Sequence, residues 1–332
     1  MKVEDFDYPL PKGLIAQRPT AVRGDSRLMV LQEDGVRHRR FSDLPEYMNE
    51  GDVLVLNDTK VIPARLKGRR RTGGAVELLL LRREGDNWSC LGKGRMREGE
   101  SILIGDTSAE VVRKSGGRLL VRFDTPDFDA FLREFGEMPV PPYIKEELDD
   151  GDRYQTVYAS ADGSIAAPTA GLHFTPELMR ELSSKGVRTA RITLHVGPGT
   201  FLPVKTAEVE GHSMEEEHFE IPGDAARLIN ETVESGGRLF AVGTTTVRAL
   251  ESSQRDGRIA ASKGWTDLFI HPPYEFSVRM DALITNFHLP RSTVLMLVSA
   301  YAGQDRLLEA YAQAVEEEYR FYSFGDAMLV FR

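Results

Sequence analysis

The hydrophobic positions of the chain predict two different kinds of sheet. Residues 53–56 form an uninterrupted apolar run, which is typical of a strand buried on both faces. After residue 150, similar runs alternate with segments of helical periodicity. Strands are expected at 187–196, 238–242 and 282–285, and helices at 176–185 and 292–302. This alternation predicts βα units that build a mainly parallel α/β domain, either layered or barrel-like.

Between residues 63 and 132 the apolar runs are shorter and follow one another without long helices. Glycine-bearing turns such as 72–74 separate them. The runs are 75–81, 88–92, 101–104, 109–113 and 118–123. Short strands at this spacing predict a small antiparallel β-barrel. We therefore expect a discontinuous α/β domain, 1–62 and 150–332, interrupted by a β-barrel domain at 63–149.

Residues 163–175 are small, glycine-bearing and almost uncharged, and they end where a helix should begin. Thr175 suits the N-cap position, Pro176 the first helical position and Glu177 the first turn. Small residues allow a ligand to approach the backbone closely. His173 lies just before this helix, beside free backbone N–H groups. Taken alone, the segment is equally compatible with a tight connection between a strand and a helix.

Polar clusters follow several of the predicted strands. They are 57–60, 243–246 and 286–288. Because ligands bind at the carboxyl ends of parallel strands, we expect these clusters to converge on one edge. An Asx turn at 57–60 and a Ser/Thr helix cap at 243–246 are the structural alternatives. The glycines of 197–199 do not open a dinucleotide fingerprint, because Leu202 occupies the third glycine position.

Charge is distributed unevenly along the chain. The net charge is −9, yet residues 60–97 contain eleven Lys and Arg against three acids, a local balance of +8. A basic field on an acidic protein is expected where a phosphate-bearing partner docks. We therefore expect the barrel to serve as a tRNA platform, with phosphate contacts from Lys67, Arg69, Arg70 and Arg71. A solvated surface with basic strand edges is the alternative.

Cys90 is the only cysteine, so the chain can form neither an internal disulfide nor a cysteine metal cluster. The first thirteen residues carry acids and two prolines, unlike a signal peptide. The longest apolar run, 294–302, is too short to span a bilayer. We expect a cytoplasmic monomer without membrane contact.

Long motifs in a fixed order resemble those of one family, the S-adenosylmethionine:tRNA ribosyltransferase-isomerases of the queuosine pathway. The matching stretches are 6–17, 25–28, 57–66, 141–144, 152–158, 163–175, 193–201, 242–252, 285–290 and 319–328. Two stretches depart from the family pattern. Glu215 stands where the family has a histidine, and residues 271–274 read His-Pro-Pro-Tyr in place of Tyr-Pro-Gly-Tyr.

The resemblance implies an α/β domain interrupted by a β-barrel, and it implies the reaction. The ribosyl part of S-adenosylmethionine is transferred and isomerised onto 7-aminomethyl-7-deazaguanine at the tRNA wobble position. The products are epoxyqueuosine-tRNA, adenine and methionine. S-adenosylmethionine is then a consumed substrate, and no cofactor is expected.

The sulfonium acidifies the C5′ protons of this substrate, so the reaction needs a general base and help for departing adenine. We expect His173, His195, His212 and Glu217 to transfer protons. Substrate binding is expected from Asp58, Arg153, Tyr154, Thr169, Gly171, Gly199, Thr244, Thr245, Arg248, Asn286 and His288. The start of the helix after residue 243, together with Arg248, is expected to hold the methionine carboxylate.

Two other functions stay open from the residues alone. His173, His195, His212, His218 and Glu217 could form the site of a metal-dependent hydrolase, although 212–218 lacks the i,i+4 spacing of a helical zinc pair. The basic barrel could instead belong to a non-catalytic RNA-binding protein. That alternative leaves the glycine-rich stretch 163–175 unexplained.

Overall fold

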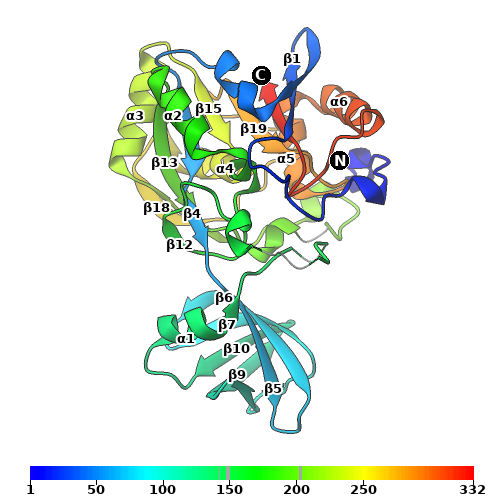
Figure 1. The fold of residues 1–332 in the computed structure, drawn as a ribbon, viewed down its shortest axis with the longest axis vertical. Helices are drawn as coiled ribbons and strands as arrows, with labels where there is room; N and C mark the ends of the chain where they lie inside the picture. The colour runs from blue at the N-terminus through cyan, green and yellow to red at the C-terminus, as the bar shows by residue number, and fades with distance from the viewer. Residues whose placement is uncertain (142, 147–149, 202–203) are drawn as a thin grey trace. The chain divides into compact units, whose positions relative to one another are not determined.

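The structure, a computed structural model, describes residues 1–141, 143–146, 150–201 and 204–332. Contacts between residues divide the chain into two compact units, whose elements are drawn in Figure 1. The larger unit contains Met1–Lys60, Pro142–Ala161 and Ala167–Arg332, and the smaller contains Val61–Pro141 and Asp162–Ala166. Residues 162–166 thus return to the smaller unit, a second crossing that the sequence did not predict.

The larger unit is built on one mixed sheet. Within the described residues its strand order is β18 (Ser262–Thr266), β14 (Glu217–Ile221), β13 (Arg188–Leu194), β3 (Val53–Asn57), β15 (Leu239–Val242), β19 (Ala282–Asn286), β20 (Ala327–Phe331), β1 (Arg27–Gln32) and β2 (Gly35–Arg40). Strands β13, β3, β15 and β19 run parallel to one another, and β20 runs parallel to β1. The other neighbours pair antiparallel.

The predicted α/β fold with an inserted barrel is confirmed, but the sheet is mixed where we expected mainly parallel pairing. Among the described residues, no α-helix lies between β13 and β14, and β20 pairs with β19 in the opposite direction. Antiparallel neighbours need no crossover helix, whereas parallel neighbours do. The parallel pairing is therefore concentrated in the centre of the sheet, where the apolar runs are.

Both faces of the central strands are covered, which explains their continuous hydrophobicity. Every residue of β3, β15 and β19 is buried. Helix α2 (Pro176–Ser184) and the 3-10 helix η3 (Phe41–Tyr47) pack against one face of the sheet. Their buried residues belong to the same hydrophobic cluster as Leu54 and Leu56 of β3. Helices α3 (Gly223–Glu234) and α4 (Thr244–Ser253) pack against β13 and β15, yet no described residue of either belongs to that cluster. They therefore cover the opposite face.

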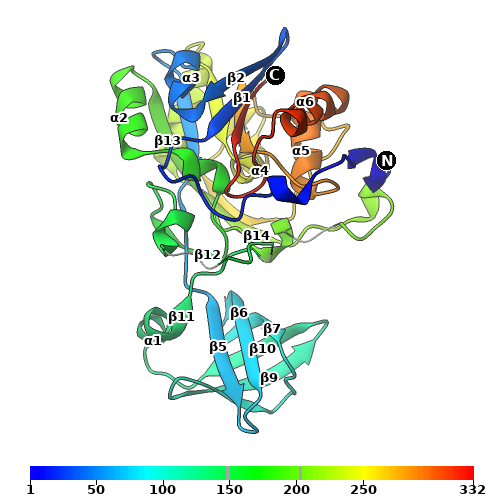
Figure 2. The ribbon, with the colours of Figure 1, turned by 45° about the vertical axis from the view of Figure 1, so that its right-hand side comes forward.

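Helices α5 (Thr293–Ala302) and α6 (Gln304–Glu316) pack against each other, as Figure 2 shows at the red end of the chain. The N-terminal 3-10 helix η1 (Val3–Phe6) lies beside them, because Gln304 Nε2 donates to the Asp5 carbonyl at 2.8 Å. The sequence reasoning missed α6 and β20. The remaining short elements are η2 (Lys12–Leu14), β4 (Thr59–Val61), η4 (Gly151–Tyr154), β12 (Ala161–Ser164), η5 (Thr169–His173), η6 (Pro198–Phe201), η7 (Val209–Gly211), β16 (Gln254–Arg255) and β17 (Arg258–Ile259). Among the described residues, none of the helices has the length and apolar character of a membrane span.

The smaller unit is a closed antiparallel barrel. Its strands are, in spatial order, β5 (Arg65–Arg70), β6 (Ala75–Glu84), β7 (Asn87–Lys93), β10 (Arg118–Phe123), β9 (Thr107–Ser115) and β8 (Ser101–Ile104). The pairing of β5 with β8 closes it, and Gly68 permits the approach, since a Cβ there would lie 2.8 Å from the Leu103 carbonyl oxygen. The short strand β11 (Gly136–Glu137) pairs with β5, and helix α1 (Phe128–Phe135) packs aromatic side chains against the barrel core.

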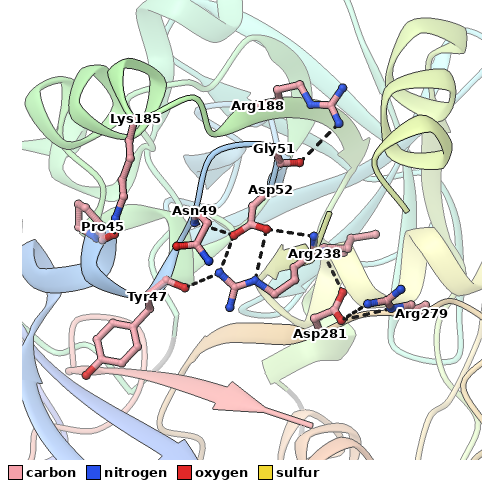
Figure 3. Close-up of polar contacts among 11 residues, drawn as sticks. Pro45, Tyr47, Asn49, Gly51, Asp52, Lys185, Arg188, Arg238, Arg279 and Asp281 are labelled. Carbon is pink, nitrogen blue, oxygen red and sulfur yellow. Dashed lines mark hydrogen bonds and ion pairs between the residues drawn. The ribbon is translucent and has the colours of Figure 1, made fainter. Parts of the chain in front are cut away.

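An ion pair fastens the amino ends of the central strands (Figure 3). Asp52, which is 3% exposed, precedes β3 and accepts hydrogen bonds from the Arg238 backbone at 3.0 Å and from the Arg238 guanidinium at 2.6 Å. Its second oxygen also accepts the Asn49 N–H at 2.7 Å. Arg238 in turn donates to the Tyr47 carbonyl, and Asp281 accepts the N–H of Leu239 at 2.9 Å. The starts of β3, β15 and β19 are thereby tied together.

Replacing Asp52 by asparagine should lower the free energy of unfolding by about 2–3 kcal/mol, because an amide group would then face donors and leave Arg238 uncompensated. Urea titration followed by circular dichroism measures this loss. The matched control is Arg279→Gln, which removes an ion pair to Asp281 whose arginine is 56% exposed. The control should change stability by less than about 1 kcal/mol. Equal losses in the two variants would contradict the assigned role of Asp52.

Candidate active site

A recess lies at the carboxyl ends of the central strands, where the polar clusters were expected to meet. Its walls come from six places in the chain: the stretch before and within η5, the loop after β13, the start of α4, the end of β19 with the loop that follows it, the start of α5, and the turn before β20. The lining residues are Ala167, Pro168, Thr169, Ala170, Val196, Gly243, Thr244, Thr245, Thr285, Asn286, His288, Val294, Tyr322 and Ser323. We call this the first recess.

The buried amide of Asn57 sets the position of the strand ends that border the first recess. Its Nδ2 donates to the Leu194 carbonyl at 2.9 Å and to Thr245 Oγ1 at 3.1 Å. Its Oδ1 accepts the N–H groups of Leu194 and Thr59 at 2.9 and 3.2 Å. One side chain therefore connects β3, β13 and α4. A buried amide that used fewer partners would be destabilising.

A second buried amide, Asn286, connects the wall of the first recess to His173. Its Nδ2 donates to the Tyr322 carbonyl and to His173 Nε2, both at 3.1 Å, and its Oδ1 accepts the Thr169 hydroxyl at 3.1 Å. Because a carbonyl can only accept, the amide orientation is fixed and His173 Nε2 must accept too. The histidine proton then sits on Nδ1, which donates to Ser26 Oγ at 2.7 Å.

Both buried histidines near the first recess are neutral. Burial, with smaller contributions from Arg320 and Arg23, lowers the pKa of His173 to about 3. Burial alone lowers the pKa of His288 to about 3. His288 lines the recess, and its Nε2 is hydrogen-bonded to Thr285 Oγ1 at 2.8 Å. His173 lies behind Asn286 and packs against the Phe41 ring, with centroids 5.0 Å apart.

The turn before β20 brings Tyr322 into the wall of the first recess with a φ of 77°. A positive φ is strained for an aromatic residue and persists only where the surroundings impose it. Here Asp326, 2% exposed, accepts the backbone N–H groups of Arg27 and Arg320 at 2.9 and 2.8 Å. Tyr322 also accepts the Gly325 N–H at 2.9 Å. We did not predict Tyr322 or Ser323 as site residues, although the motif at 319–328 contains them.

A second recess adjoins the first, and the two share Thr244, Thr245 and Val294. The other residues of its wall are Met214, Arg248, Leu268, Phe269, Ile270, Thr293 and Leu297. Arg248, 5% exposed, forms an ion pair with Glu217, and its Nε donates to the Leu268 carbonyl at 2.9 Å. Glu217 also accepts the Gly197 N–H at 2.7 Å. The Arg248 guanidinium is therefore held in place and its charge is balanced.

His195 and His212 are half-buried, unlike His173. His195 Nδ1 is hydrogen-bonded to Thr59 Oγ1 at 2.7 Å, and its ring stacks on His218 with centroids 5.7 Å apart. His212 packs edge-on against Phe269, and burial lowers its pKa. Each lies close in sequence to a wall of a recess, since Val196 lines the first and Met214 the second.

Five other predicted site residues lie outside the lining of the two recesses. Asp58 accepts the hydroxyls of Thr193 and Ser160, and Arg153 donates to the carbonyls of Thr20 and Ala21. Tyr154 is fully buried against Phe324. Gly171 allows Tyr158 to approach, since a Cβ at this position would lie 2.1 Å from the Tyr158 hydroxyl. Gly199 approaches Glu215, with 3.4 Å between the position of a Cβ and the Glu215 side chain.

The basic residues predicted to contact tRNA lie on or beside strand β5 of the barrel. Lys67, Arg69 and Arg71 are exposed. Lys67 forms an ion pair with Glu137 at 2.8 Å, and exposed pairs of this kind contribute little stability. Arg70 is half-buried and pairs with Glu100 at 2.5 Å. A groove on the barrel is lined by Lys67 and Arg69 together with Lys93.

The predicted alternative of a metal-dependent hydrolase finds no support in the geometry. Among the described residues, no group of three or more His, Cys, Asp or Glu side chains is arranged to hold a metal ion. His195 and His218 stack face to face, and Glu217 faces Arg248.

Because of the two buried neutral histidines, the free energy of unfolding should decrease as the pH is lowered. In the unfolded chain each takes up a proton near pH 6.5, whereas the folded protein resists protonation down to about pH 3. The free energy of unfolding therefore keeps its full value above about pH 6.5. Below that pH, each histidine lowers it by up to about 1.4 kcal/mol for every pH unit. Urea titrations between about pH 7 and pH 5.5 measure the slope, and His173→Gln should reduce it. An unchanged slope in that variant would contradict the assignment.

Comparison with known proteins shows which family the chain resembles. The model of a family described as queuosine biosynthesis protein matches residues 3–330. The S-adenosylmethionine:tRNA ribosyltransferase-isomerase of Moorella thermoacetica is 53% identical, with 99% of this chain and 100% of the relative covered. The protein of the same name from Natranaerobius thermophilus is 49% identical, with 99% of each chain covered.

A solved structure is also similar. The crystal structure of S-adenosylmethionine tRNA ribosyltransferase from Thermotoga maritima is 42% identical in sequence, with a TM-score of 0.57. The alignment covers 98% of this chain and 99% of that one. With a family match over nearly the whole length and relatives at about half identity, the chain belongs to the queuosine biosynthesis protein family.

Proposed function

We propose that the chain is an S-adenosylmethionine:tRNA ribosyltransferase-isomerase that acts on 7-aminomethyl-7-deazaguanine at the tRNA wobble position. The ribosyl group moves to the aminomethyl nitrogen and is isomerised to an epoxycyclopentane, so that adenine and methionine leave. The family assignment and the full-length relatives support the reaction class. The observation that carries the proposal is the first recess, which stands at the carboxyl ends of parallel strands and is lined by neutral hydrogen-bonding groups.

A neutral lining suits the nucleoside part of the substrate. The hydroxyl oxygens of Thr169 and Thr285 keep lone pairs that can accept hydrogen bonds from ribose hydroxyls and from the adenine amino group. Tyr322 contributes an aromatic ring to this wall. A contact between that ring and the sulfonium would contribute on the order of 1 kcal/mol.

The geometry divides the proposed proton-transfer residues into two pairs. His173 and Glu217 are buried, and their acceptor atoms are occupied by Asn286, Gly197 and Arg248. We assign them a positioning role. His195 and His212 are half-buried and lie within two residues in sequence of Val196 and Met214, which line the recesses, so we propose them as the residues that exchange protons with a substrate. His288 lines the first recess as a neutral hydrogen-bonding group.

The two substrates are proposed to use different surfaces of the chain. Thr244 and Thr245 at the start of α4, where backbone N–H groups are unpaired by the helix itself, are proposed to contact the methionine carboxylate. The exposed cations of β5 are proposed to contact tRNA phosphates. A single-stranded anticodon base can then be splayed from its neighbours and read in a pocket.

The deciding experiment supplies the purified protein with S-adenosylmethionine and tRNA that carries 7-aminomethyl-7-deazaguanine. We expect free adenine in a one-to-one ratio with modified tRNA, and a heavier nucleoside after digestion. Chromatography and mass spectrometry measure both. His195→Ala and His212→Ala should each lower the single-turnover rate by about 10²–10⁴-fold, which is the usual contribution of a general acid or base.

The control for these variants is His38→Ala, whose histidine lies on the edge strand β2 and bonds Tyr319. It should release adenine at the parental rate. If no adenine appears when both substrates are present, the proposed function is wrong. If His195→Ala and His212→Ala stay within about tenfold of the parent, only their proton-transfer role is wrong.

Replacing Lys67, Arg69 and Arg71 together by alanine should flatten the salt dependence of tRNA binding. Each lost phosphate contact reduces the slope of log K against log salt by about 0.7–0.9. Filter binding at several salt concentrations measures the slope. Arg70→Gln serves as control, because the Arg70 side chain is only 20% exposed and is paired with Glu100, whereas the Lys67 side chain is 58% exposed. It should leave the slope nearly unchanged. A parental slope in the triple variant would place the RNA on another surface.

A further inference from the structure

The two recesses adjoin each other at a pair of helix starts. Thr244 and Thr245 belong to the first turn of α4, and Thr293 and Val294 begin α5. Thr244, Thr245 and Val294 line both recesses. A ligand that occupies both recesses must therefore pass these three residues. Each helix has ten residues, so both starts carry the partial positive charge of a helix N-terminus.

The linings of the two recesses differ in charge. No Asp, Glu, Lys or Arg is among the described residues that line the first recess. The second contains Arg248, and its remaining wall is largely apolar, with Met214, Phe269 and Leu297 among its members. A substrate with an uncharged end and a zwitterionic end would place the uncharged end in the first recess and the zwitterionic end in the second.

Thr293, a residue of the second recess wall, carries an unused polar group. The residue is 4% exposed, and within the described part of the chain its Oγ1 has no hydrogen-bond partner. A buried hydroxyl without a partner is unfavourable, and most such groups in proteins are satisfied. Ser292 caps α5 by accepting the Leu295 N–H at 3.3 Å, which leaves the first N–H groups of the helix for another acceptor. The hydroxyl and the helix start together suit a carboxylate.

The ion pair between Arg248 and Glu217 indicates that the second recess binds the carboxylate of an amino acid and not a phosphate. Glu217 already balances the charge of Arg248. A phosphate would bring uncompensated negative charge into a buried place, which is costly. An amino-acid head group carries an ammonium beside its carboxylate and is neutral overall. Its aliphatic chain and sulfur can lie against Met214, Phe269 and Leu297.

We infer that the second recess is the binding site for the methionyl part of S-adenosylmethionine and for the methionine product, with Thr293 and the start of α5 as carboxylate contacts in addition to Thr244 and Thr245. The adenosine part then occupies the first recess, and the sulfonium lies between them beside Val294. This inference rests on the proposed function. It adds Thr293, Met214 and Leu297 to the residues that select the substrate.

Titration calorimetry with L-methionine and with adenosine, in the absence of tRNA, tests the inference. Thr293→Val keeps the shape of the side chain and removes the hydroxyl. It should weaken binding of L-methionine and of S-adenosylmethionine about tenfold and leave adenosine binding unchanged. Thr285→Val, in the first recess, should show the reverse pattern, with weaker adenosine binding and unchanged L-methionine binding.

The matched control is Ser299→Ala on the same helix. Ser299 is 1% exposed, and its hydroxyl also lacks a partner within the described residues, but it lines neither recess. It should bind L-methionine like the parent. If Thr293→Val and Ser299→Ala bind L-methionine equally well, or if L-methionine does not bind the parent while S-adenosylmethionine does, the inference is wrong.

These outcomes separate the inference from the proposed function. Release of adenine together with equal L-methionine binding by Thr293→Val and Ser299→Ala would reject the inference alone. Thr293-dependent L-methionine binding without any release of adenine from modified tRNA would reject the proposed function alone.

Discussion

The requirement that buried amides use all of their hydrogen-bonding groups holds the candidate site together. Asn57 is fully buried and Asn286 is 2% exposed. Asn57 joins the ends of β3 and β13 to the start of α4, and Asn286 joins the end of β19 to η5 and to the turn before β20. Neither amide could lose a partner without a penalty of about 1–3 kcal/mol. The recess walls, drawn from distant parts of the chain, are therefore fixed relative to one another.

At the opposite ends of the same strands, charged side chains make the connections. Asp52 and Arg238 connect the starts of β3 and β15, and Asp281 adds the start of β19. Charged side chains connect the starts of these strands, whereas the neutral amides of Asn57 and Asn286 connect their ends. No Asp, Glu, Lys or Arg is among the described residues that line the first recess, where a sulfonium nucleoside is proposed to react. Neutral His173 and His288 follow from the same burial.

The buried ion pair of Glu217 and Arg248 shows that residues predicted to act in catalysis or substrate binding also stabilise the structure. The sequence offered Glu217 as a base and Arg248 as a carboxylate ligand. The structure places them against each other, with Glu217 also accepting the Gly197 N–H. Such a pair fixes the loop after β13 against α4. It also positions the Arg248 guanidinium in the wall of the second recess without giving that recess a net charge.

The sequence by itself determined the fold class, the inserted barrel and the family, because these depend on hydrophobic periodicity, glycine-bearing turns and long local motifs. It also determined that the polar clusters after β15 and β19 would meet, since parallel strands present their carboxyl ends on one edge. Only the tertiary structure decided which polar groups face the recess. Asn57 and Tyr322 gained their roles, and Glu217 was paired with Arg248, through contacts between segments more than thirty residues apart. Local patterns carry no information about partners at that separation, so burial and hydrogen bonding had to be read from the folded chain.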